Sequence, residues 1–115
     1  MVCVMSVFGP VVTGLIDISE DDDLSAAIDL DPSHEWQGFD FVKIMIPAMT
    51  AANLSLMGCL SIDGTFADIA ASESIPVTTS ARADTLKLGG FRFIKIKTSV
   101  AQAADRTFSL QGEKV

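Results

Sequence analysis

Apolar and polar residues alternate with a period of two along several short stretches of this chain, a pattern typical of β-strands. The clearest stretch is Phe41–Ile46, which is rich in the Val, Ile and Phe that strands favour. A second stretch, residues 54–62, ends at Asp63-Gly64, a dipeptide that favours hairpin turns. The sequence therefore predicts two central strands, a tight turn at Asp63-Gly64 and a short return strand over residues 66–69.

Weaker alternation predicts further strands before and after this pair. These are residues 11–18, 24–30, 75–79, 85–88, 91–97 and 106–110. Residues 1–8 form either an edge strand or an arm, because Gly9-Pro10 follows them and proline cannot donate to a β-ladder. Gly14 marks an expected bulge, and the residues after Leu110 are expected to be a frayed tail.

About eight short strands, with turn signals roughly every 8–12 residues, predict an all-β fold. The longer connections favour an antiparallel β-sandwich of jelly-roll or Greek-key type over a simple meander. A chain of 115 residues is long enough for one such domain, so we predict a single domain over residues 1–115. Residues 1–18 belong either to the edge of its sheet or to an extended N-terminal arm.

Composition and charge limit the partners of this domain. Hydrophobic residues make up 49% of the chain, which indicates either a very full core or apolar surface held against another protein. The net charge of −7 is unevenly distributed along the chain. Residues 1–40 contain nine acidic residues and no Lys or Arg. Such an acidic segment argues against direct nucleic-acid binding, which depends on neutralising phosphates. It is compatible with docking on a basic protein surface.

The start of the chain resembles neither a signal peptide nor a membrane anchor. Residues 1–16 lack Lys and Arg, and no stretch reaches the ~20 apolar residues that a membrane helix needs. We therefore expect a soluble protein made in the cytoplasm of its host, with no membrane partner.

Candidate catalytic and ligand-binding residues are few. The polar loop over residues 31–38 holds the only His and the only Trp, Trp36, but no Ser or Cys is placed as a nucleophile for the His. The acids at 20–23 lack the spacing and central Gly of a calcium-binding EF-hand loop. Cys3 and Cys59 lie in apolar stretches and are expected to be reduced core residues. We expect no enzymatic activity, cofactor or metal site.

Three segments resemble a family of small structural proteins of tailed-phage virions. They read LSAAIDL at 24–30, IPAMTAANLSLMGCLSIDGTFADI at 46–69 and FRFIKIKTSVAQAADRTFSL at 91–110. The family carries blocks of the type PAAWTAANLTF followed by DG..F, and later QxADRT, and Met49 stands where it often has Trp. The same layout resembles galactose-binding-like jelly rolls. The resemblance implies a structural virion role.

Two functions follow from these observations as expectations. The first is a non-enzymatic capsid decoration or cement protein on the virion surface, bound to the major capsid protein and oligomeric, with a trimer favoured. Its expected interface residues are Val2, Val4, Phe8, Val11, Val12 and Trp36. The second is a carbohydrate-binding or adhesion module associated with a tail or head fibre, in which the exposed Trp36 would stack on a sugar.

Overall fold

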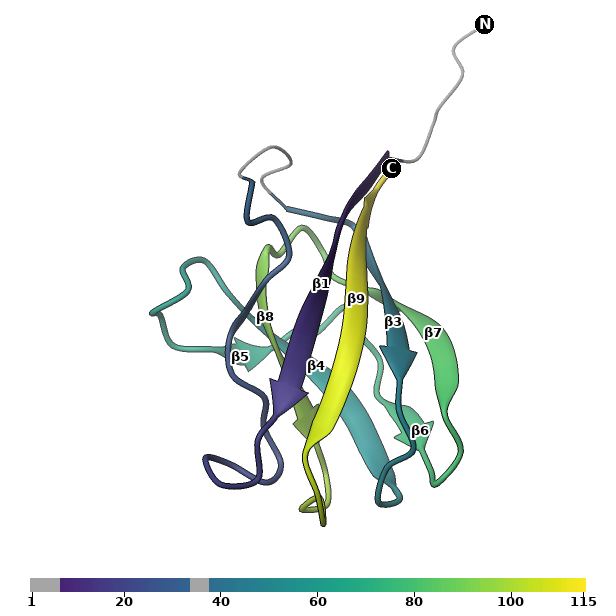
Figure 1. Ribbon diagram of the computed structural model, residues 1–115. Helices are drawn as coiled ribbons and strands as arrows, with labels where there is room; N and C mark the ends of the chain where they lie inside the picture. The colour runs from purple at the N-terminus through teal and green to yellow at the C-terminus, as the bar shows by residue number, and fades with distance from the viewer. Residues whose placement is uncertain (1–6, 34–37) are drawn as a thin grey trace, which may run out of the picture.

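Two antiparallel β-sheets pack face to face in the computed structural model, which describes residues 7–33 and 38–115 (Figure 1). Sheet A contains, in order, β1 (Val7–Ile16), β9 (Arg106–Lys114), β3 (Phe41–Ile46) and β7 (Arg82–Lys87). Sheet B contains β2 (Ile28–Asp29), β8 (Phe93–Thr98) and β4 (Ala52–Cys59), with β5 (Ala67–Asp68) and β6 (Ile75–Val77) both paired to β4. The predicted all-β antiparallel sandwich is confirmed.

The connections between strands explain why the fold is a sandwich and not a meander. Among the described strands, every connection except those from β4 to β5 and from β5 to β6 passes from one sheet to the other. In Figure 1 the four strands of sheet A run side by side, and β4 of sheet B passes behind β9. This crossing pattern is the one expected of the predicted jelly-roll or Greek-key class. No helix in the described part of the chain is long and apolar enough to cross a membrane.

Alternate residues of both sheets form the core. In β3 the three inward side chains are Val42, Ile44 and Ile46, as the period of two predicts, and each is at most 2% exposed. Ile94 and Ile96 of β8 face them from sheet B and are fully buried. Full burial of one such aliphatic side chain stabilises the fold by roughly 1.5–3 kcal/mol, so both strands contribute substantially to the core.

Two glycines in sheet A make room for a large ring. Phe39 is 1% exposed and its ring lies against the backbone of Gly9 in β1 and Gly112 in β9, where a Cβ atom would overlap the ring. Phe39 therefore closes one end of the core, and side chains larger than hydrogen are excluded at both glycines.

The structure corrects the prediction for the first strand. Residues 7–16 form one strand that runs through Gly9-Pro10, and the separation predicted there is wrong. The register against β9 shifts between Phe8 and Val11, while Gly14 pairs regularly with Phe108, so the bulge lies at Gly9-Pro10 and not at Gly14. A bulge on an edge strand accommodates proline because no β-ladder donor is required there.

The tail and the hairpin are also different from the predictions. The strand predicted to end at Leu110 continues to Lys114 and pairs with both β1 and β3, so the frayed tail is wrong. Strand β4 ends at Cys59 and β5 begins at Ala67, so Asp63-Gly64 does not form a two-residue hairpin turn. The connection between the two strands has seven residues, 60–66, and the strands pair through Gly58 and Ala67.

Candidate functional site

The solvent-facing side of sheet A is the first candidate surface, and we call it the outer A face. The strand register places fourteen side chains on it: Phe8, Val11, Thr13 and Leu15 from β1; Thr107, Ser109, Gln111 and Glu113 from β9; Phe41, Lys43 and Met45 from β3; and Ala83, Thr85 and Lys87 from β7. Sheet B packs against the other side of sheet A, and no described strand lies over this face, where Val11 and Met45 are exposed.

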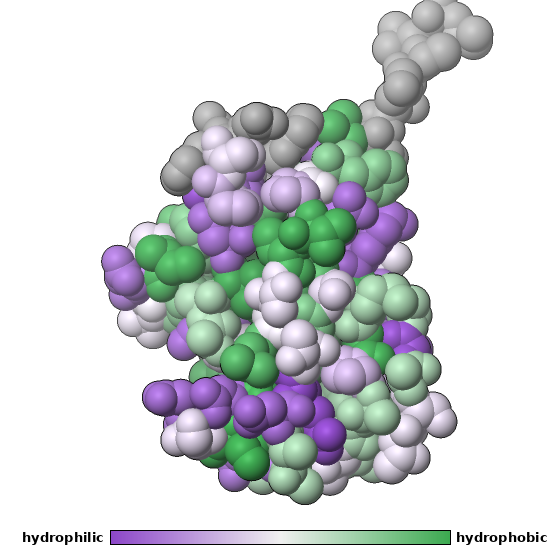
Figure 2. Space-filling model, viewed as in Figure 1, coloured by the Kyte–Doolittle hydropathy of each residue, from purple (hydrophilic) through white to green (hydrophobic). Residues whose placement is uncertain are grey.

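Large apolar side chains are exposed on the outer A face. Val11 is 68% exposed and Met45 is 60% exposed, and Phe8 and Leu15 are partly exposed beside them. Figure 2 shows hydrophobic residues in green among pale and white ones in the middle of the molecule, viewed as in Figure 1. Single exposed apolar residues are ordinary on a protein surface, but several on one flat face are typical of a contact surface.

Charges on the outer A face are few and partly neutralised. Lys43 Nζ lies 3.9 Å from a carboxylate oxygen of Glu113 and 5.6 Å from the centre of the Phe8 ring. The adjoining row of Thr13, Ser109, Met45 and Ala83 contains no charge. The centre of the face can therefore be covered by another protein without burying an unpaired ion, which would be costly.

A shallow hollow lies in the centre of this face. It has a volume of about 210 Å³ and is lined by Val11, Lys43, Met45, Ser109, Leu110 and Gln111. The hollow lies between the exposed side chains of Val11 and Met45, so the face is uneven, with a depression next to the protruding, flexible Met45. Such relief suits the docking of an apolar side chain from another chain.

The predicted interface residues are distributed over different environments. Phe8 and Val11 lie on the outer A face and are exposed. Val12 is partly buried and packs against the core, because it lies on the opposite side of β1. The expected interface residues Val2, Val4 and Trp36 lie outside the described residues. Sequence reasoning missed Met45, and its alternation with the buried residues of β3 was the available signal.

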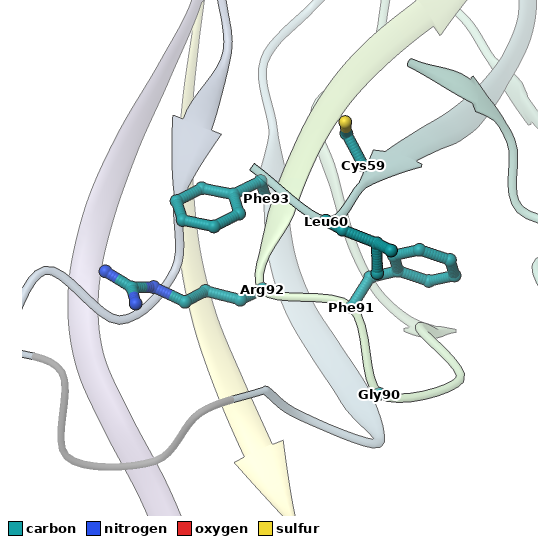
Figure 3. Close-up of a pocket in the computed structure, with 6 residues that line it drawn as sticks. All are labelled: Cys59, Leu60, Gly90, Phe91, Arg92 and Phe93. Carbon is teal, nitrogen blue, oxygen red and sulfur yellow. The ribbon is translucent and has the colours of Figure 1, made fainter. Parts of the chain in front are cut away.

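The solvent-facing side of sheet B is a second and different surface, which we call the outer B face. At one end it has a hollow of about 210 Å³ lined by Cys59, Leu60, Gly90, Phe91, Arg92 and Phe93 (Figure 3). In Figure 3 Leu60 lies beside the Phe91 ring, and the Arg92 side chain extends away from them. Leu60 is 90% exposed. Cys59 is a free thiol, but it is only half-buried, so the predicted core position is wrong.

Cations on the outer B face are held by aromatic rings and carboxylates. Arg92 donates to both carboxylate oxygens of Asp29, from Nε and Nη2, at 2.8 Å each. Its guanidinium carbon also lies 4.6 Å from the centre of the Phe93 ring, and Lys95 Nζ lies 4.8 Å from that of Phe66. The hydrogen bonds to Asp29 raise the pKa of Arg92. This arrangement fixes the guanidinium between a carboxylate and an aromatic ring.

The residues of the QxADRT segment have structural roles. Gln102 is 4% exposed, and its Oε1 accepts from the Thr50 backbone N–H at 2.9 Å and from Arg106 Nε at 3.1 Å. Asp105 Oδ1 accepts from the Ile18 backbone N–H at 3.0 Å. These bonds fasten three loops at one end of the sandwich.

The acidic loop after β1 is exposed. One carboxylate oxygen from each of Asp21, Asp22 and Asp23 lies within 4.8 Å of the others. A hydrogen bond to the Asp21 carboxyl raises the pKa of Asp23, which shows how closely the charges approach. All three residues are exposed, and exposed acids of this kind are usual on protein surfaces. We therefore assign no metal ion to this cluster.

Comparisons with known proteins add no relative. No family model, no curated protein and no solved structure matches this chain. The resemblance to phage virion proteins therefore stays a prediction, and the function has to be argued from the two faces.

Proposed function

We propose that this protein is a non-enzymatic capsid decoration or cement protein of a phage virion. The observation that supports the proposal is the outer A face, where Val11 and Met45 are exposed and the row that contains Met45 carries no charge. A decoration protein acts by covering neighbouring shell subunits, so it needs a stable domain with an apolar contact surface and no reactive site. The resemblance in residues 24–110 supports the same role.

The proposed mechanism is burial of apolar surface summed over many copies. Each Å² of apolar surface removed from water contributes roughly 25 cal/mol, before the entropic cost of association is subtracted. The partner in this proposal is the major capsid protein, on the outside of the head. A modest contact per copy stabilises the shell substantially because the contact is repeated at every capsomer.

The proposal is tested on purified particles. We expect the protein in intact heads at a fixed ratio to the major capsid protein, measured by quantitative mass spectrometry. Heads assembled without it should release their DNA at a lower temperature and regain stability when the purified protein is added. Absence of the protein from particles, together with no binding to undecorated heads, would contradict the proposal.

A carbohydrate-binding module is the second candidate, and the hollow on the outer B face favours it. Phe91, Phe93 and the anchored Arg92 combine ring faces with a planar polar group, as sugar sites do. On a glycan array this function predicts a signal that is reduced by Phe93→Ala and also by Trp36→Ala. A blank array, or an unchanged profile for both variants, would remove this candidate.

A further inference from the structure

We infer that the outer A face is the contact surface of a homodimer, in which two copies of this chain pack sheet A against sheet A. The face has no covering element among the described residues, and it carries the exposed apolar side chains of β1 and β3. The inference is tested on the purified chain alone and so does not depend on the proposed function. The same face can contact only one partner at a time, so in the proposed function the weak dimer dissociates before the face contacts the capsid.

Self-complementarity is the first reason to choose a second copy as the occupant. Met45 protrudes among the small side chains of Ser109 and Ala83, which are its direct neighbours on β9 and β7. The hollow beside Met45 has a volume of about 210 Å³. A two-fold axis between β9 and β3 therefore places Met45 of each copy over Ser109 and the hollow of the other. Met45 of each copy then packs against the small side chains of the other copy. The contact is thus made by the same surface on both copies, as in an isologous dimer.

Charge is the second reason. The chain has a net charge of −7, so most pairs of surfaces on two copies repel one another. The outer A face carries only Lys43, Lys87 and Glu113, and Lys43 lies next to Glu113. Two copies of this face meet without a concentration of negative charge, while a strongly acidic or basic partner finds little to pair with there.

The size of the face fits a weak dimer. Strands lie about 4.8 Å apart and rise about 3.4 Å per residue, so four strands over the paired rows cover a flat footprint of roughly 400 Å² per copy. Upright side chains such as Val11 and Met45 raise the accessible area above this footprint. The total lies near the lower end of specific interfaces, at about 1,200 Å² or below, so we expect a dimer that dissociates on dilution.

Symmetry distinguishes this dimer from the trimer expected from the sequence. A three-fold assembly needs two different complementary surfaces on each chain, whereas a two-fold contact needs one surface that fits itself. The outer A face is one surface of the second kind. The number of copies in the assembly therefore separates the two expectations.

Sedimentation velocity of the purified full chain tests the inference over about 1–500 µM, the range that suits a small interface. The wild-type mass should rise with concentration from 12.2 kDa to twice that value and no further. Met45→Lys should stay at 12.2 kDa, because it places a charge at the centre of the contact. Leu60→Lys alters a more exposed side chain on a different surface and should dimerise as the wild type does.

Val11→Lys provides a second disruption on β1, and circular dichroism with thermal unfolding verifies that each variant is folded. A wild-type chain that remains monomeric at the highest concentration overturns the inference. A dimer that persists in both folded Lys variants, or a trimer, overturns it equally. Loss of the dimer in Leu60→Lys alone would place the contact on the outer B face.

Discussion

The two outer faces of the sandwich are built on the same strand geometry but differ in chemistry. On the outer A face, Val11 and Met45 are exposed and the central row is uncharged. On the outer B face, Arg92 and Lys95 lie over aromatic rings, and Arg92 is bound to Asp29 through two hydrogen bonds. Apolar side chains on the A face are available to another chain, whereas the cations of the B face already have partners within the domain.

This difference shows how a small sandwich can separate stability from recognition. Side chains that make contacts within the domain contribute to its free energy of unfolding, and exposed side chains contribute little. Substitutions on the outer A face should therefore change association and not stability. Substitutions on the outer B face should do the reverse.

The largest effect on the free energy of unfolding is expected at Gly112, where sheet A packs against the buried Phe39 ring. Gly112→Val places a side chain where the Phe39 ring packs, so the ring or β9 must shift. We expect a loss of about 2–3 kcal/mol in the free energy of unfolding, measured by urea denaturation. Ala83→Val, which adds the same kind of group on the solvent-facing side of β7, is the matched control and should change stability by less than about 0.5 kcal/mol.

The next effect compares one cation from each face. Arg92→Met removes two hydrogen bonds to Asp29 and a contact with Phe93, and should cost about 1–2 kcal/mol of unfolding free energy. Lys43→Met removes an exposed pair with Glu113 at 3.9 Å and an exposed contact with the Phe8 ring at 5.6 Å, and should cost less than about 0.5 kcal/mol. Equal costs for the two variants in urea denaturation would abolish the proposed difference between the faces.

A smaller effect on stability is expected from two apolar residues. Phe93→Ser removes a half-buried ring and should cost about 1 kcal/mol, while Met45→Ser should cost less than about 0.5 kcal/mol because Met45 is 60% exposed. Association should respond in the opposite order, with dimerisation weakened by Met45→Ser and retained by Phe93→Ser. Differential scanning calorimetry and sedimentation velocity measure the two responses on the same samples.

The smallest effect is the response of the dimer to salt. Because the outer A face carries few charges, raising the salt concentration from about 50 to 500 mM should change the dimer dissociation constant by less than about threefold. An interface formed by the cations of the outer B face would weaken much more strongly. A steep salt dependence in sedimentation equilibrium would therefore shift the contact away from the outer A face.

Much of the fold was predictable because alternation of buried and exposed residues reports the sheet directly. Strand β3 was predicted with its observed bounds, and its buried residues alternate as the period of two predicts. The errors arose where pairing with neighbouring strands determines where a strand ends. Residues 111–114 are polar and contain a glycine, yet β9 continues through them because β1 and β3 pair with it on either side.

The candidate surface was less predictable than the fold. Phe8 and Val11 were identified because residues 1–18 are apolar and lack basic residues, but Val12 alternates to the inner side of β1. Met45 was missed because it lies in a strand that was predicted to be central, and no exposed side of that strand was expected. The sequence shows which residues share a side of a strand, but only the structure shows that, within residues 7–33 and 38–115, no element lies over the outer side of β3.

The most direct test of the account is methionine oxidation as a function of protein concentration, measured by peptide mass spectrometry after brief peroxide treatment. Met45 on the outer A face should be oxidised readily in dilute protein and become protected as concentration rises. Met57, which faces outward from β4 on the B side, should keep the same rate, and Met49, 2% exposed, should stay slow throughout. Equal rates for Met45 in dilute and concentrated protein would contradict the account.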